Sequence, residues 1–155
     1  MPAAFAPDEI NHSAPTSKAR LKWVIAVRED IPAGAAANAI ACVGAGITTR
    51  VPGLIAPGPT DAGGRSHYAL PWAGCTILAT NQDQLTRIRD LATRDDTEVV
   101  AMPQLAQDTR VFAEVEAGIT AQHDPELLAV AVVGPRNAIS RIVRKLPLYG
   151  DTSGS

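Results

Sequence analysis

The sequence predicts an α/β domain, a three-layer sandwich in which a mixed, mostly buried sheet of four to five strands lies between helices. Three observations support this fold class. Short apolar runs alternate with segments of helical periodicity in the order β-α-β-α-β-α-β-α. The runs within 21–28 and 125–135 are apolar on both faces, as in central strands. Apolar residues form 46% of the 155-residue chain, a normal share for one globular domain.

We expect a single domain over residues 20–149. Residues 1–19 mix Pro, Ala, Ser and Thr without periodicity and are expected to form a disordered or loosely docked tail, and residues 150–155 a flexible C-terminal tail. No apolar run is long enough for a membrane span or a secretory leader. Two cysteines make no disulfide framework, and the dispersed histidines make no zinc motif. These features predict a cytoplasmic protein without a metal site.

The first two elements are a strand over 21–28 (LKWVIAVR) and a helix that starts after Pro32. The helix is predicted by the run 33–46 (AGAAANAIACVGAG), because Ala is the best helix former and a linker would contain less of it. Gly44 and Gly46 repeat half of a GxGxxG fingerprint, but they lie too far beyond the strand to cradle a dinucleotide. We expect Gly46 to supply a left-handed helix cap, and we expect no cofactor.

A long loop over 48–72 follows, rich in Pro and Gly, with a short strand predicted at 54–56. Loops of this length tend to be functional or disordered. Asn81 is predicted to cap the next helix. The later elements are expected to be strand 73–80, helix 82–94, strand 97–102, a helix from about 109, a strand within 125–135, helix 136–146 and a last short strand at 147–149.

Candidate acid–base groups are densest in the long loop, where Asp61, Ser66, His67 and Tyr68 occur together. A loop histidine beside a Gly-Gly turn is typical of a catalytic base, and equally of a solvated side chain. Their proximity in sequence does not by itself indicate a catalytic triad.

The small-residue helix carries two further candidates, Asn38 and Cys42, four residues apart and therefore on one face. Asn38 either contacts a ligand or forms an internal hydrogen bond between helix and sheet. Cys42 either lines a site or is a small buried hydrophobe, and no neighbouring charge predicts an activated thiolate.

The final helix is basic, with Arg136, Arg141, Arg144 and Lys145, and residues 135–149 contain no acid. This pattern is compatible with a phosphate-binding face, because guanidinium groups match phosphate geometry. It is also compatible with a solvated face whose cations offset the helix dipole. The chain's net charge of −2 gives no general attraction for nucleic acid.

The order and spacing of several segments resemble the class II peptidyl-tRNA hydrolases. The strand end 28–31 (REDI) is similar to the family's Arg-x-Asp-Leu, and 36–38 (AAN) resembles its Ala-Ala-Gln. Residues 127–149 resemble its closing strand, Gly-Pro turn, helix and short strand. The loop with His67 and the segment 106–112 (AQDTRVF) look closer still to a bacterial offshoot known as domain of unknown function 2000.

This resemblance covers about residues 20–149 and implies a class II peptidyl-tRNA hydrolase-like fold. The chain departs from the hydrolase pattern at the reacting groups. Gly34 stands where the family has a Lys, Ala41 where it has a His, and Leu105 where it has an Asp. The family's Thr is kept as Thr109.

The resemblance implies an acyl or aminoacyl ester as substrate, for hydrolysis or transfer, with the hydrolases' Lys and His lost. The catalytic candidates are His67, Asn38, Thr109 and Asp61. The ligand-binding candidates are Asp30, Cys42, Gly134, Pro135, Arg136 and Arg141. The alternative is a non-catalytic dimeric module that binds a small molecule or a protein. A third hypothesis keeps tRNA binding through Arg136, Arg141 and Arg144. We expect a homodimer with no membrane partner.

Overall fold

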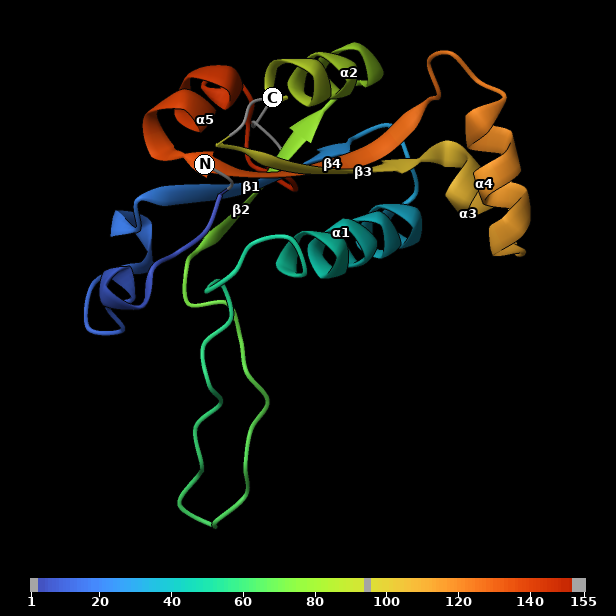
Figure 1. Ribbon diagram of the computed structural model, residues 1–155. Helices are drawn as coiled ribbons and strands as arrows, with labels where there is room; N and C mark the ends of the chain where they lie inside the picture. The colour runs from blue at the N-terminus through green and yellow to red at the C-terminus, as the bar shows by residue number, and fades with distance from the viewer. Residues whose placement is uncertain (1–2, 94–95, 152–155) are drawn as a thin grey trace.

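Figure 1 shows the computed structural model, which describes residues 3–93 and 96–151. Two short 3-10 turns, Pro7–Glu9 and Thr16–Lys18, precede the first strand. The strands and helices that follow are β1 (Leu21–Arg28), α1 (Ala33–Thr48), β2 (Cys75–Thr80), α2 (Gln82–Leu91), β3 (Glu98–Pro103), α3 (Gln104–Asp108), α4 (Phe112–Thr120), β4 (Leu127–Pro135) and α5 (Arg136–Val143).

The sheet is mixed, with the strand order β2-β1-β4-β3. β1 pairs with β2 in parallel and with β4 antiparallel, and β3 pairs with β4 antiparallel. β1 and β4 occupy the centre, which explains why both are buried on both faces. The short strand expected at 147–149 is a single bridge between Leu78 and Leu148. The described sheet therefore has four strands.

Helices cover both faces of this sheet. α1 lies on one face, and α2 and α5 lie on the other (Figure 1). On the α1 side, alternate residues of β1 such as Trp23 and Ile25 belong to one hydrophobic cluster with Val43. The residues between them, Val24 and Ala26, join the cluster beneath α2 and α5. The prediction of an α/β domain with a mixed sheet is confirmed.

The prediction that Gly46 caps α1 is wrong. α1 continues to Thr48 and ends at Thr49, which has right-handed helical backbone angles. Gly46 lies inside the helix, where an added Cβ would stand 3.0 Å from Val100 Cγ1. The missing side chain therefore lets α1 approach β3 closely, which is the use of small residues that its composition indicates.

The helix predicted from about residue 109 is α4, which begins at Phe112, and a short helix that was not predicted, α3, precedes it. α3 begins directly after Pro103, and Val111 is the N-cap residue of α4. The two helices pack closely because Gly118 has no side chain: a Cβ there would lie 2.1 Å from the end of Leu105. Asn81 caps α2 as predicted, accepting a 2.9 Å hydrogen bond from the Gln84 amide.

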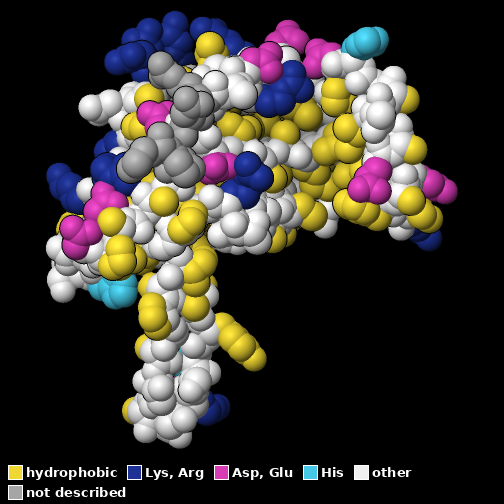
Figure 2. Space-filling view, in the orientation of Figure 1, with side chains coloured by type: hydrophobic (Ala, Val, Ile, Leu, Met, Phe, Trp, Pro, Cys, Tyr) yellow, Lys and Arg dark blue, Asp and Glu magenta, His cyan; other side chains and the backbone are white. Residues whose placement is uncertain are grey.

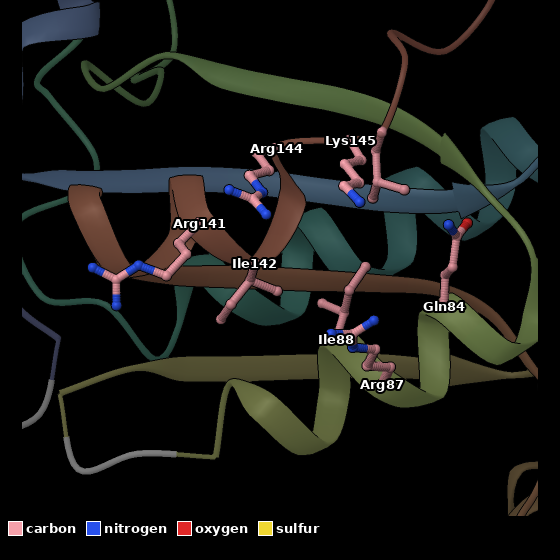
Figure 3. Close-up of a pocket in the computed structure, with 8 residues that line it drawn as sticks. Gln84, Arg87, Ile88, Arg141, Ile142, Arg144 and Lys145 are labelled. Carbon is pink, nitrogen blue, oxygen red and sulfur yellow. The ribbon is translucent and has the colours of Figure 1, made fainter.

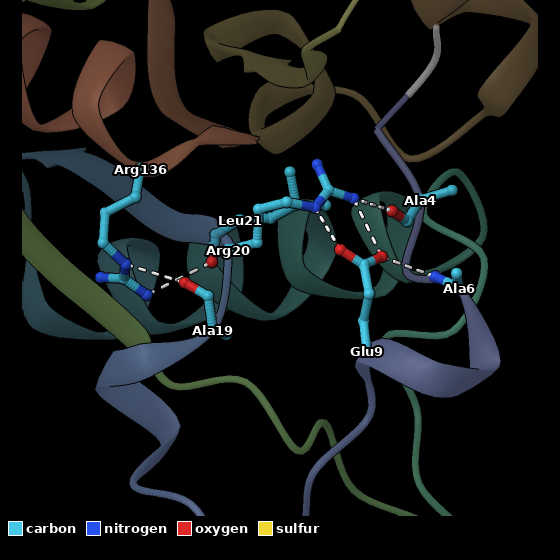
Figure 4. Close-up of polar contacts among 7 residues, drawn as sticks. All are labelled: Ala4, Ala6, Glu9, Ala19, Arg20, Leu21 and Arg136. Carbon is cyan, nitrogen blue, oxygen red and sulfur yellow. Dashed lines mark hydrogen bonds and ion pairs between the residues drawn. The ribbon is translucent and has the colours of Figure 1, made fainter.

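Within residues 3–19, for which composition predicts a disordered or loosely docked tail, a few side chains are anchored on the domain and most are exposed. Phe5 is only 5% exposed, stacks edge-on against Trp72 and donates its amide to Pro52 O. Figure 4 shows a second anchor, in which Arg20 pairs with Glu9 and donates to Ala4 O at 2.7 Å. One buried aromatic and one ion pair thus fix a segment of otherwise featureless composition. Residues 152–155 of the expected C-terminal tail lie outside the described residues.

The predicted long loop forms an extended arm, residues 55–71, that projects from the α1 side of the sheet (Figure 1). Two isolated bridges, Ile55 with Pro71 and Thr60 with Ser66, hold its two limbs together. Gly64 turns the chain near the tip with a φ of +81°, where a side chain would be strained. The strand expected at 54–56 is thus only the bridge at Ile55.

Candidate functional site

An open cleft lies under the edge strand β3, between α1 and the α3–α4 pair. We call it the apolar cleft. Its volume is about 480 Å³. Figure 2 shows hydrophobic side chains gathered in the hollow beside α3 and α4. The lining residues are Asn38, Cys42 and Val43 of α1, Val100 to Pro103 of β3, Ala106 of α3, Thr109 and Arg110, and Phe112, Val115, Glu116 and Ile119 of α4.

The cleft exists because α3 and α4 follow the end of β3 and do not pack over the face of the sheet beside α1. α4 buries Val115 but leaves Phe112 75% exposed and Ile119 37% exposed. A large aromatic side chain so exposed beside other apolar groups is unusual for a monomer surface. The cleft is therefore an apolar surface that the described chain does not cover.

The polar groups of the cleft include three residues that the sequence singled out: Asn38, Cys42 and Thr109. Asn38 Nδ2 donates a 3.1 Å hydrogen bond to Gln107 Oε1, which ties α1 to α3. This contact is exposed, so Asn38 is not a hydrogen-bonding group buried between helix and sheet. Cys42 is also exposed, which contradicts its interpretation as a small buried hydrophobe.

Gln107 was missed by sequence reasoning. Its only signal was its place two residues before Thr109 in the segment that resembles the bacterial family. Arg110 and Glu116 add the charged groups of the lining.

His67 and Asp61 contact each other on the arm, and neither lines the apolar cleft. His67 Nε2 lies 3.1 Å from Asp61 Oδ2. Asp61 Oδ1 accepts hydrogen bonds from the amides of Gly63 at 2.9 Å and Arg65 at 3.0 Å. The Arg65 amide, followed by the His67 ring, holds the pKa of Asp61 below its usual value. The arrangement closes the tip of the arm, and it keeps the imidazole beside an ionised carboxylate.

Four of the ligand-binding candidates have roles in holding the fold together, namely Asp30, Gly134, Pro135 and Arg136. Asp30 pairs with Arg28 at 2.6 Å, and this guanidinium lowers the pKa of the Asp30 carboxyl. Pro135 is the N-cap residue of α5. A Cβ on Gly134 would stand 2.6 Å from Thr97 Oγ1, so a glycine is needed for packing there.

Arg136 is directed toward the backbone that precedes β1. Its Nε donates to Ala19 O at 2.8 Å, and Figure 4 shows this contact. The guanidinium therefore fixes the start of the sheet and is separated from the other cations that the sequence grouped with it.

Arg141 lines a second hollow, between α2 and α5, which we call the basic groove (Figure 3). Arg144 and Lys145 line it with Arg141, and α2 contributes Arg87. Sequence reasoning missed Arg87, because it considered the final helix alone. The volume of the basic groove is about 330 Å³.

Within residues 3–93 and 96–151, no group of three or more His, Cys, Asp or Glu side chains is placed to hold a metal ion. Among the helices of this described part, none has the length and apolarity that crossing a membrane requires.

Comparison with known proteins gives a family and a fold. The family described as "Protein of unknown function (DUF2000)" matches residues 21–150. A solved structure of a protein of unknown function, Atu0240 from Agrobacterium tumefaciens strain C58, is similar with a TM-score of 0.76 and 17% sequence identity, covering 84% of this chain and 98% of that one. No curated protein matches. Because the family match spans nearly the whole domain, the chain belongs to the DUF2000 family.

Proposed function

We propose that this protein is a binding module that holds the acyl or other apolar group of a small molecule in the apolar cleft. The observation that carries the proposal is the cleft itself, about 480 Å³ in volume and lined mainly by apolar side chains with a few polar groups. Small-molecule sites generally have this size and this composition.

The lining suits a flexible apolar chain with one polar end. Met102 is an adaptable side chain that fits irregular ligand surfaces, and Phe112 offers an exposed aromatic face. The hydroxyl of Thr109, at the end of α3, and the amide of Asn38, on α1, can form hydrogen bonds with a carbonyl or hydroxyl group. An ester or amide of a medium-length acid has this division into an apolar and a polar part.

Binding is favoured over hydrolysis because a nucleophile and its base do not meet in the cleft. Cys42 is the cysteine of the lining, and within the described residues no histidine lies beside it there. A nucleophile of this kind requires an adjacent base or a lowered pKa. Gly34 and Ala41 on the same helix carry no acid–base group.

Hydrolysis or transfer of an acyl ester is the second candidate function, and the His67–Asp61 contact at 3.1 Å favours it. An aspartate that orients an imidazole is a common arrangement for a general base. In this function the arm would have to bring His67 to the ligand.

We further propose that the module is a homodimer in which the arm contacts a second copy of the chain. Tyr68 is 95% exposed and Leu70 is 74% exposed, both on the arm. A two-stranded ribbon without a hydrophobic face of its own is at best marginally stable in water. A second copy would cover these apolar side chains and support the arm, as in symmetric dimers generally.

Methyl octanoate is a suitable probe, because it has an apolar chain and an ester end. The chain has two methionines, so methyl-¹³C-methionine labelling gives a resonance from Met102 inside the cleft and a reference from Met1. We expect a saturable shift of the Met102 signal with an unchanged ester. An unshifted Met102 resonance would contradict binding in the cleft, and release of methanol in the same sample would favour the hydrolase.

A further inference from the structure

The basic groove carries four cationic side chains from two helices. Arg87 comes from α2, Arg141 from α5, and Arg144 and Lys145 from the segment directly after α5. All four line one hollow, and Figure 3 shows the Arg141 side chain extending away from Arg87. The chain as a whole has a net charge of −2, so this concentration of positive charge is local.

None of these four side chains has a carboxylate partner among residues 3–93 and 96–151. In contrast, Arg20, Arg28, Arg50, Arg65 and Arg89 each form an ion pair with an Asp or Glu. Asp90, which borders the adjoining hollow, already pairs with Arg89 at 2.9 Å. The cations of the groove therefore repel one another, and a bound anion would relieve this repulsion.

The rest of the lining also selects for an anion. The side chain of Gln84 is fixed, because its Oε1 accepts a hydrogen bond from Thr80 Oγ1 at 2.8 Å, which leaves its NH₂ group as a donor. Gln84 lies in the first turn of α2, where the helix dipole adds positive potential. Ile88 and Ile142 form apolar parts of the wall, along which the stems of the long basic side chains can lie.

Compensation of a helix dipole does not account for this arrangement. Arg144 and Lys145 follow the C-terminus of α5, where cations are favourable. Arg87 lies in the middle of α2 on a different helix, and it faces the same hollow. The dipole of α5 therefore does not explain why cations from two helices line the same hollow.

We propose that the basic groove binds the phosphate or diphosphate group of a small phosphorylated molecule. Three guanidinium groups offer the paired donors that match phosphate oxygens, and the ammonium of Lys145 adds a fourth charge. The volume of about 330 Å³ is that of a small-ligand site. The described lining holds no aromatic side chain on which a nucleobase would stack, so recognition centres on the phosphate.

The groove is lined from α2 and α5 and the apolar cleft from α1, and these helices lie on opposite faces of the sheet (Figure 1). The phosphate site is thus independent of the proposed function of the cleft, and each is tested without the other.

The test is calorimetric titration of the full chain with pyrophosphate at low ionic strength. Arg87→Gln/Arg141→Gln removes two cations of the groove, both on exposed side chains, so the core is left intact. The matched control, Lys18→Gln/Arg50→Gln, changes the net charge equally at exposed positions that line neither the groove nor the apolar cleft. We expect the groove variant to bind pyrophosphate at least about tenfold more weakly and the control within about twofold of the wild type.

Three results would overturn the proposal. The first is an equal loss in both double variants, which would mean that only net charge matters. The second is equal affinity for citrate, which would mean that phosphate is not recognised as such. The third is tight binding of a single-stranded RNA oligonucleotide that pyrophosphate does not displace, which would assign the surface to a nucleic acid.

Discussion

The docking of the N-terminal segment gives a sharp prediction, because the chain contains two phenylalanines in opposite environments. Phe5 is 5% exposed, and its ring centroid lies 4.7 Å from that of Trp72. Phe112 is 75% exposed. Phe5→Ala and Phe112→Ala are the same chemical change, so the difference between them isolates the effect of burial.

Truncating a buried phenylalanine costs about 3–5 kcal/mol in general, which sets the upper limit for Phe5→Ala. The loss will be smaller where residues 3–19 detach while the sheet stays folded, because the free energy of unfolding cannot fall by more than the docking contributes. An exposed residue such as Phe112 lies outside the core, and its truncation should change the free energy of unfolding by about 0.5 kcal/mol or less.

Two assays separate these effects. Urea unfolding followed by tryptophan fluorescence gives the free energy of unfolding. Limited trypsin digestion at Lys18 and Arg20 reports detachment of the segment. We expect faster cleavage and an altered Trp72 emission for Phe5→Ala, with wild-type behaviour for Phe112→Ala. Wild-type cleavage rates and emission in Phe5→Ala would refute the packing of this segment.

Three further predictions follow from named contacts. Arg20 lowers the pKa of Glu9 from 4.5 to about 2, so this ion pair stabilises the docking of residues 3–19 above pH 4.5 and is lost as the pH falls toward 2. Digestion with a protease that is active at acid pH should therefore become faster across that range. Glu9→Gln should abolish this pH dependence. Asn81→Ala should lower the free energy of unfolding by about 1 kcal/mol in urea titrations through loss of the α2 cap, and an unchanged midpoint would contradict it. Tyr68→Ser/Leu70→Ser should shift the mass in analytical ultracentrifugation from dimer to monomer, whereas a monomeric wild type would refute the dimer.

Periodicity predicted the elements whose pattern is local. The strand 21–28 has the bounds of β1, because its residues are apolar on both faces and Pro32 ends the extended segment. The Asn81 cap is equally local, since the donor and acceptor lie three residues apart. The prediction for Gly46 failed for the opposite reason. The role of Gly46 depends on its contact with Val100, a residue distant in sequence, and no residue near Gly46 in the sequence indicates that contact.

The candidate site was predictable only in part. Helical spacing placed Asn38 and Cys42 on one face, and the structure brings Thr109 to the same cleft. The density of polar groups around His67 indicated a site, but the arm carries His67 and Asp61 apart from that cleft. The partnership of Arg87 with Arg141 required the packing of α2 beside α5, which no single segment encodes.

The most direct test of the proposed function compares two substitutions in a titration with methyl octanoate. Ala106→Phe fills the apolar cleft from α3, and Ala113→Phe adds the same ring at an exposed position of α4 outside the lining. We expect a saturable shift of the Met102 methyl resonance in the wild type and in Ala113→Phe, and none in Ala106→Phe. An equal shift in all three proteins, or a shift in none, would contradict the assignment of this cleft as the binding site.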